Sequence, residues 1–145
     1  MISVWESAII NAPAPEVWSL IRDFNGLPRW TPFVAASHIE DSLPADKIGC
    51  IRNFVLKDGA KIREQLLGLS DQDLSVTYAI VESPMGVTNY VSTLQLRPVT
   101  DSNQCFAEWG AHFDGPSGRD AELAETVGKG VFLTALRALK ARFDV

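Results

Sequence analysis

Alternating hydrophobic and polar positions predict β-strands at the start of the chain and through its middle. Residues 2–10 alternate in this way, with Ile2, Val4 and Ile10 on one face. Six further runs follow the same pattern between the turn-forming segments SLPADKIG, KDG, SDQD, SPMG and TDSN. Because hairpin-length segments connect consecutive runs, we expect an antiparallel meander with strands near 34–41, 49–57, 60–69, 74–82, 88–98 and 104–114.

The hydrophobic period becomes helical in two segments. In NAPAPEVWSLIRDF the prolines stand at the entry, and the apolar spacing predicts a short helix near 14–22. The next segment, GLPRWTPF, is broken by glycine and proline, so at most one further helical turn fits there. Near the C-terminus a continuous apolar stripe predicts one long helix over 117–143, with Ser117 and Asp120 resembling a capping box.

Two glycines, Gly128 and Gly130, stand in the middle of the predicted long helix. Each costs about 1 kcal/mol relative to alanine, so either the backbone packs closely there or space is left open. The order of elements predicts one α+β domain over 1–145, in which a seven-stranded antiparallel sheet wraps around the C-terminal helix, with one or two short helices after the first strand. A sheet curved in this way leaves a gap beside the helix, and such a gap is the default site for a ligand.

One carboxylate falls where a hydrophobic core is expected. In AKIREQLLGL, strand alternation places Ile62, Glu64, Leu66 and Gly68 on one face. A buried carboxylate is costly unless it is paired or used. Glu64 is therefore either a polar group in a cavity or a structural partner of Arg52, which shares a face with hydrophobic residues of its own strand.

Composition narrows the class of protein. The 145-residue chain is 46% hydrophobic and 21% charged, which is typical of a soluble globular domain. Its net charge of −5 argues against nucleic acid as a partner, because phosphate binding needs clustered basic residues. MISVWESAII has neither a basic n-region nor a long apolar run, so we expect no signal peptide and no membrane span. Cys50 and Cys105 lack CxxC spacing; we expect buried thiols in a reducing cytoplasm, with a disulfide as the alternative.

Several strings resemble the helix-grip superfamily, which includes START domains, the birch-pollen allergen and polyketide cyclase/dehydrase-like proteins. PAPEVWSLIRDFNGLPRWTPFV is similar to the opening helix and loop of the abscisic-acid receptor-like branch. IGCIRNFVLKDGAKIREQLLGLSDQDLSVTYAI is similar to its strands around a gate loop, and TNYVSTLQL to the strand after its latch loop. The resemblance implies a helix-grip fold with a small hydrophobic ligand in an internal cavity, and KDGAK and SPMG as mobile loops at its mouth.

The resemblance also implies the positions of polar cavity groups. The predicted ligand-binding residues are Arg52, Phe54, Glu64, Tyr78, Tyr90, Ser92, Glu108 and Phe132. Alternation in CFAEWGAHFD instead directs Trp109 and its apolar neighbours inward and leaves Glu108 in water, so the two lines of reasoning disagree at Glu108. Thr31 stands where the receptors have a ligand-binding lysine, and the gate and latch strings differ, so hormone binding and phosphatase docking are not implied.

The remaining signals exclude several kinds of site. His38 and His112 are far apart in the sequence and stand in no nucleophile motif, so we expect no metal site and no cofactor. Three functions remain open: binding of a small hydrophobic or amphipathic molecule, a cyclase/dehydratase-like enzyme with Glu64 or Tyr90 as the general acid or base, and a protein-interaction module. A homodimer is left open with the third.

Overall fold

Seven strands form one antiparallel sheet in the order β1-β7-β6-β5-β4-β3-β2 in a computed structural model, which describes residues 1–144. The predicted meander is confirmed. The strands are β1 (Ile2–Ile10), β2 (Val34–Ile39), β3 (Ile51–Leu56), β4 (Lys61–Ser70), β5 (Ser75–Glu82), β6 (Thr88–Val99) and β7 (Gln104–Asp114). The α+β fold and the helix-grip architecture are likewise confirmed.

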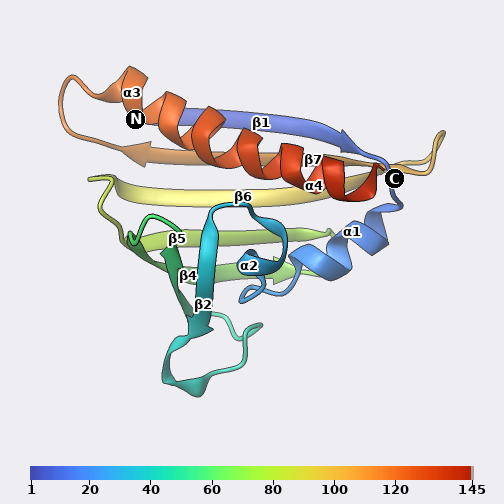
Figure 1. The fold of residues 1–145 in the computed structure, drawn as a ribbon, viewed down its shortest axis with the longest axis horizontal. Coiled ribbons are helices and arrows are strands. Elements are labelled where there is room, and N and C mark those ends of the chain that lie inside the picture. The colour runs from blue at the N-terminus through green and yellow to red at the C-terminus, as the bar shows by residue number, and fades with distance from the viewer. Residues whose placement is uncertain (145) are drawn as a thin grey trace.

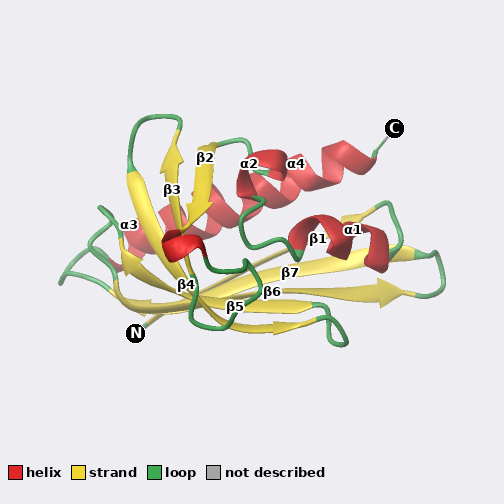
Figure 2. Cartoon of the chain, turned by 90° about the horizontal axis from the view of Figure 1, so that it is seen from below, coloured by secondary structure: helices red, strands yellow, loops and turns green. Residues whose placement is uncertain are grey.

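The sheet is strongly curled around the C-terminal helix. Figure 1 shows that helix lying across β1, β7 and β6, and Figure 2 shows β2 and β3 rising steeply from the long strands toward it. Two short helices, α1 (Ala14–Ile21) and α2 (Leu27–Trp30), follow the first strand as expected, and a 3-10 turn, η1 (Glu40–Ser42), follows β2. Pro13 and Pro15 at the start of α1 are favourable because these positions need no intrahelical N–H donor.

The long helix has three consecutive parts: α3 (Asp120–Glu125), the π-helical segment η2 (Thr126–Leu133) and α4 (Thr134–Phe143). It begins three residues later than predicted. The predicted capping box is wrong, because Arg119 is the N-cap residue and no side chain caps the first turn. The π-helical turn was not predicted; such turns are rare and are frequent at functional sites.

Irregular pairing of β4 with β5 changes which residues face the helix. The register shifts between Arg63 and Glu64 and again between Leu66 and Gly68. Leu67 is the extra residue at the second shift, and Gly68 therefore pairs with Thr77, whose hydroxyl bonds Thr93 on the outer face. The prediction that Gly68 shares a face with Glu64 is wrong, because a bulge reverses the alternation.

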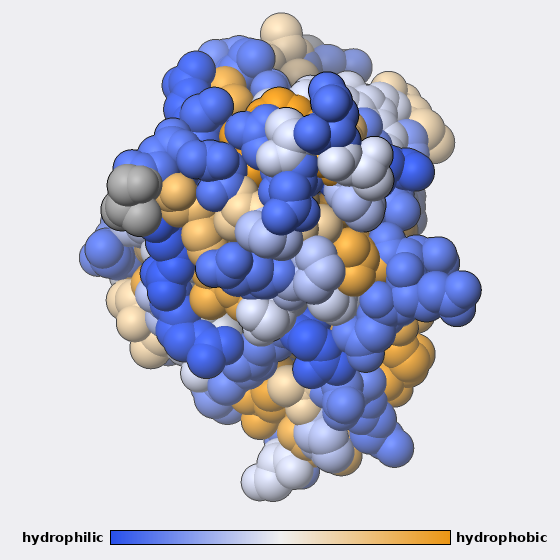
Figure 3. Space-filling view, turned by 90° about the vertical axis from the view of Figure 1, so that its right-hand side faces the viewer, coloured by the Kyte–Doolittle hydropathy of each residue, from blue (hydrophilic) through white to orange (hydrophobic). Residues whose placement is uncertain are grey.

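Hydrophobic side chains of all seven strands and the long helix form one core. Cys50 and Cys105 lie in it as free thiols, which confirms the prediction of buried, unbonded cysteines. Exposed large hydrophobic residues are distributed over a loop, the N-terminus and four strands. At the end of the molecule seen in Figure 3, hydrophobic residues emerge as small patches between hydrophilic ones.

Candidate functional site

A cavity of about 350 Å³ lies between the curled sheet and the η2 segment of the long helix. Its volume is at the lower end of the range for small-molecule sites, roughly 300–1,000 Å³. Most of the residues around it are hydrophobic or aromatic. The lining consists of Leu27, Thr31, Phe33, Arg52, Phe54, Leu56, Asp58, Ala60, Ile62, Glu64, Tyr78, Ile80, Pro84, Met85, Tyr90, Trp109, Thr126, Val127, Gly130 and Val131.

Two loops reach the mouth of the cavity. The β3–β4 turn contributes Asp58 and Ala60, and the β5–β6 loop contributes Pro84 and Met85. Gly59 and Gly86 adopt φ angles of 95° and 79°, which residues with a side chain rarely adopt. The predicted position of KDGAK and SPMG at the mouth agrees with this arrangement; their mobility stays a prediction.

A buried ion pair forms the polar wall of the cavity. Arg52 on β3 and Glu64 on β4 are directly opposed across the strands, and they are only 5% and 6% exposed. The Arg52 Nε and Nη2 atoms lie 2.8 and 2.7 Å from the Glu64 Oε1 atom, and Nη1 donates to the Phe24 carbonyl at 3.2 Å. The sequence offered two alternative roles for Glu64, and the structure combines them: Glu64 pairs with Arg52 and also lines the cavity.

Aromatic rings and burial set the electrostatics of this pair. The Arg52 guanidinium lies 4.0 Å from the centre of the Phe24 ring and 4.6 Å from that of Tyr78, distances typical of cation–π contacts. Burial raises the pKa of the Glu64 carboxyl, while Arg52 opposes the rise. The two short contacts from the Arg52 guanidinium, which stays charged in proteins, favour the ionised carboxylate and so limit this rise.

Hydroxyl groups from β5 and β6 complete the polar wall. The Trp109 Nε1 atom donates both to the Tyr78 hydroxyl, at 3.1 Å, and to Ser92 Oγ, at 2.9 Å. Ser92 in turn donates to the Gly110 carbonyl at 3.0 Å. Burial raises the pKa of Tyr78 and of Tyr90 well above the ordinary value for tyrosine. Both phenols are therefore protonated near neutral pH, so each is able to donate a hydrogen bond.

The two glycines of the long helix serve different purposes. A Cβ atom at Gly128 would lie 3.4 Å from Glu6 Oε1 and 3.6 Å from Val4 Cβ, so this turn packs closely on β1. The neighbouring Lys129 ammonium pairs with Glu6 at 3.0 Å. A Cβ atom at Gly130 would meet only a helix carbonyl, at 3.9 Å, and Gly130 lines the cavity. The helix backbone is therefore closely packed at Gly128, whereas there is open space beside Gly130.

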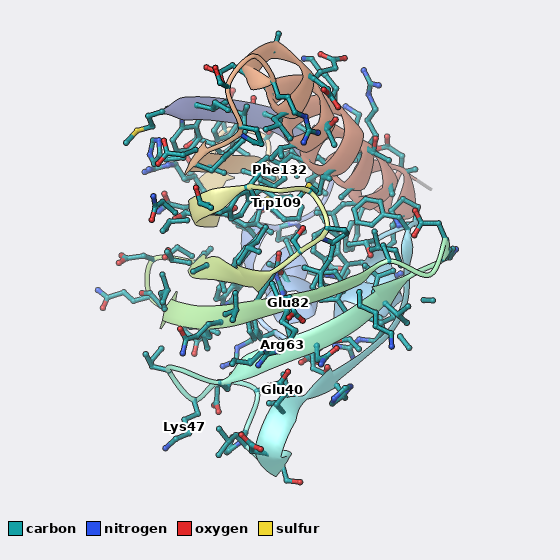
Figure 4. The ribbon with its side chains drawn as sticks, turned by 90° about the vertical axis from the view of Figure 1, so that its left-hand side faces the viewer. Glu40, Lys47, Arg63, Glu82, Trp109 and Phe132 are labelled. Carbon is teal, nitrogen blue, oxygen red and sulfur yellow. The ribbon has the colours of Figure 1, made fainter. Side chains whose placement is uncertain are left out.

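Five of the predicted ligand-binding residues line the cavity: Arg52, Phe54, Glu64, Tyr78 and Tyr90. Ser92 and Phe132 lie behind the wall, where Ser92 bonds Trp109 and the Phe132 ring stacks on Trp109 at 4.5 Å (Figure 4). Glu108 belongs to the opposite face of β7, because Trp109 and Ala107 face the core. Alternation was right at Glu108, and the position implied by the resemblance was wrong.

A model of the family described as polyketide cyclase / dehydrase and lipid transport matches residues 1–144. The chain belongs to this family. Two bacterial proteins of known structure resemble it closely. XoxI from Bacillus cereus is 32% identical with a TM-score of 0.88, covering 99% of this chain and 96% of that one. A protein from Thermobifida fusca is 30% identical with a TM-score of 0.88, covering 99% and 93%.

Two plant proteins show a more distant likeness. The abscisic acid receptor PYL7 from Arabidopsis thaliana is 29% identical over 92 residues, which are 61% of this chain and 42% of the receptor. The chain thus matches less than half of the receptor's length. Norcoclaurine synthase from Thalictrum flavum, solved with a transition-state analogue, is 14% identical with a TM-score of 0.74, covering 97% of this chain and 92% of that one. This last likeness concerns the fold alone.

Several residues that line the cavity were not predicted as ligand-binding residues. Thr31 and Phe33 line it from the segment after α2, and Val127, Gly130 and Val131 line it from η2. The glycine in the helix was the signal for the second group. In the first group, the resemblance gave a signal at Thr31, which stands where the receptors have a ligand-binding lysine, whereas the irregular backbone gave none at Phe33. No group of three or more metal-ligating side chains occurs within residues 1–144, and no helix in that range is long and apolar enough to cross a membrane.

Proposed function

We propose that this protein binds a small amphipathic molecule in the cavity between the sheet and the long helix. The observation that carries the proposal is a mostly apolar cavity with a buried Arg52–Glu64 pair and tyrosine hydroxyls on one wall. Convergent polar groups in an apolar cavity are typical of sites that orient a ligand. The family's description, which names both enzymes and lipid transport, is consistent with such a ligand.

Catalysis of a cyclase or dehydratase type is the second candidate, and Glu64 is the residue that favours it. Burial raises the pKa of its carboxyl, as in many general acids and bases. The two cavity tyrosines are unsuited to act as bases near neutral pH, because burial raises the pKa of each still further from that range. An enzymatic role would therefore need Glu64 as the base, and the two tyrosines would be restricted to donating protons.

Native mass spectrometry of the protein as purified tests the proposal. An apolar cavity that binds amphipathic molecules retains one, so we expect a discrete added mass that disappears on denaturation. Incubation of the protein with the extracted molecule separates the two candidates: an unchanged molecule supports a binding protein, and conversion to a product of different mass or retention supports an enzyme. A ligand-free protein that binds no member of an amphipathic compound library would contradict both.

A further inference from the structure

The cavity lining carries more acidic than basic side chains, and its basic side chain is already paired. Of the described lining residues, Arg52 is the one cation, whereas Glu64 and Asp58 are anions. Three of the five Arg52 N–H groups are directed at Glu64 and at the Phe24 carbonyl, and the Phe24 and Tyr78 rings lie against the guanidinium. An anionic ligand would therefore find the only cation already paired and covered.

Hydrogen-bond capacity toward a ligand remains on Glu64. Both contacts from Arg52 go to Oε1, and within residues 1–144 no side chain or backbone N–H donates to Oε2. A carboxylate oxygen accepts but does not donate, so it pairs with an N–H or O–H group of a ligand. The Tyr78 hydroxyl also lines the cavity, and there it accepts a hydrogen bond from Trp109 Nε1.

From this arrangement we propose, building on the ligand-binding function above, that the cavity selects uncharged or cationic molecules with an apolar body and an N–H or O–H donor for Glu64, and that it rejects anions. A carboxylate or sulfonate in this cavity would lose its hydration, face Glu64 and Asp58, and gain no free cation. An amine or alcohol would satisfy Glu64 Oε2 with a charge-assisted hydrogen bond.

Three matched fluorescent probes test the selection by charge and by donor. N-phenyl-2-naphthylamine is uncharged and carries one N–H group. 6-Anilino-2-naphthalenesulfonate has the same scaffold with a sulfonate, and N-methyl-N-phenyl-2-naphthylamine has no N–H group. We expect the first to bind wild-type protein saturably, and the sulfonate to displace it only at concentrations at least about tenfold higher. We expect the N-methylated probe to bind more weakly, also by about tenfold.

Each outcome decides between separate claims. Displacement by the sulfonate at concentrations equal to those of the uncharged probe would overturn the rejection of anions. Equal affinity for the N-methylated probe would overturn the donor requirement. If the uncharged probe does not bind at all, the ligand-binding function itself fails. The variant Glu64→Gln removes the anion that pairs with Arg52, so we expect it to bind the sulfonate more tightly than wild type does. A cooperative thermal transition shows whether the variant is folded. If it is not folded, the comparison of the three probes on wild-type protein still tests the proposal.

Discussion

At the scale of single residues, the Arg52–Glu64 pair combines a structural and a functional position. It joins neighbouring strands in the core, and it is also the polar wall of the cavity. Burying two charges is costly, and the short contacts offset that cost only while both partners are present. Removal of one partner is therefore expected to destabilise the protein more than removal of both.

We predict that Glu64→Gln destabilises the protein, because it leaves Arg52 as a buried, uncompensated cation. The loss in free energy of unfolding is expected at the lower end of about 3–5 kcal/mol, since glutamine still accepts a hydrogen bond. Urea denaturation followed by circular dichroism measures it. The double variant Arg52→Met, Glu64→Leu is the matched control and should recover most of the loss. If the single variant is as stable as wild type, the pair has no structural role.

A second ion pair, on the outer face of β4, makes stability depend on pH. The Arg63 guanidinium holds Glu40 with two hydrogen bonds of 2.7 and 2.9 Å, and Figure 4 shows these two residues near each other below Glu82. The hydrogen bond from Arg63 lowers the pKa of Glu40 from 4.5 to about 2, despite an opposing effect of desolvation. A lowered folded-state pKa stabilises the protein above the unfolded-state value, and the effect is lost as the pH falls toward 2.

We therefore predict that Glu40→Gln lowers the melting temperature at pH 6 and that this difference shrinks as the pH falls from about 4.5 toward 2. Thermal melts of both proteins across this range measure the effect. Asp101, an exposed acid for which the structure gives no partner within residues 1–144, is the control position, and Asp101→Asn should change the melting temperature little at any of these pH values. A difference that stays constant with pH would contradict the assigned role of Glu40.

Sequence reasoning located the pair but not every neighbour. Alternation placed Arg52 and Glu64 inward, and the strand order brought them together. It also placed Ser92 inward, but the Ser92 hydroxyl accepts a hydrogen bond from the Trp109 indole and does not line the cavity. Such a contact depends on packing between β6 and β7, which alternation does not specify. The resemblance to the receptor-like branch placed Glu108 in the cavity, although the alternation of the residues around it already indicated an outward side chain.

At the scale of elements, strand bounds were predicted closely because turn residues and alternation are local. The π-helical segment η2 was not predicted, because it involves contacts with the other end of the chain: Gly128 packs on β1, and Lys129 pairs with Glu6. The bulge at Leu67 has a similar origin, since it depends on pairing with β5. Both irregularities border the residues that line the cavity, so the least predictable elements are those that shape it.

We predict that the two mouth loops, residues 57–60 and 83–87, open in the free protein and close over a ligand. Their glycines permit the change in backbone angles that such a motion needs. Hydrogen exchange should be fast in both loops and slow in the adjoining strands, and a bound probe should slow exchange in the loops. The β6–β7 turn, which lies outside the lining, is the internal control. Loops as protected as their strands before any ligand is added would contradict this prediction.

At the scale of the whole molecule, the fold is shared by proteins with very different sequences. The fold extends to a protein only 14% identical, so the fold alone does not identify a ligand. In this chain the helix passes close to β1 at Gly128, whereas Gly130 is exposed, lines the cavity and leaves room for a side chain. A side chain at position 130 is therefore expected to occlude the cavity without disturbing the fold.

Titration of N-phenyl-2-naphthylamine into wild type and Gly130→Leu tests the ligand-binding cavity most directly. The leucine extends into open space at the mouth and replaces a glycine in a helix, so the melting temperature should be equal or higher. Arg137→Leu adds the same side chain at an exposed position outside the lining and is the control. We expect saturable binding to wild type and to Arg137→Leu, and an affinity at least about tenfold lower for Gly130→Leu, the equivalent of about 1.4 kcal/mol. Equal affinity for all three proteins, or no saturable binding to wild type, would contradict a ligand site between the sheet and the helix.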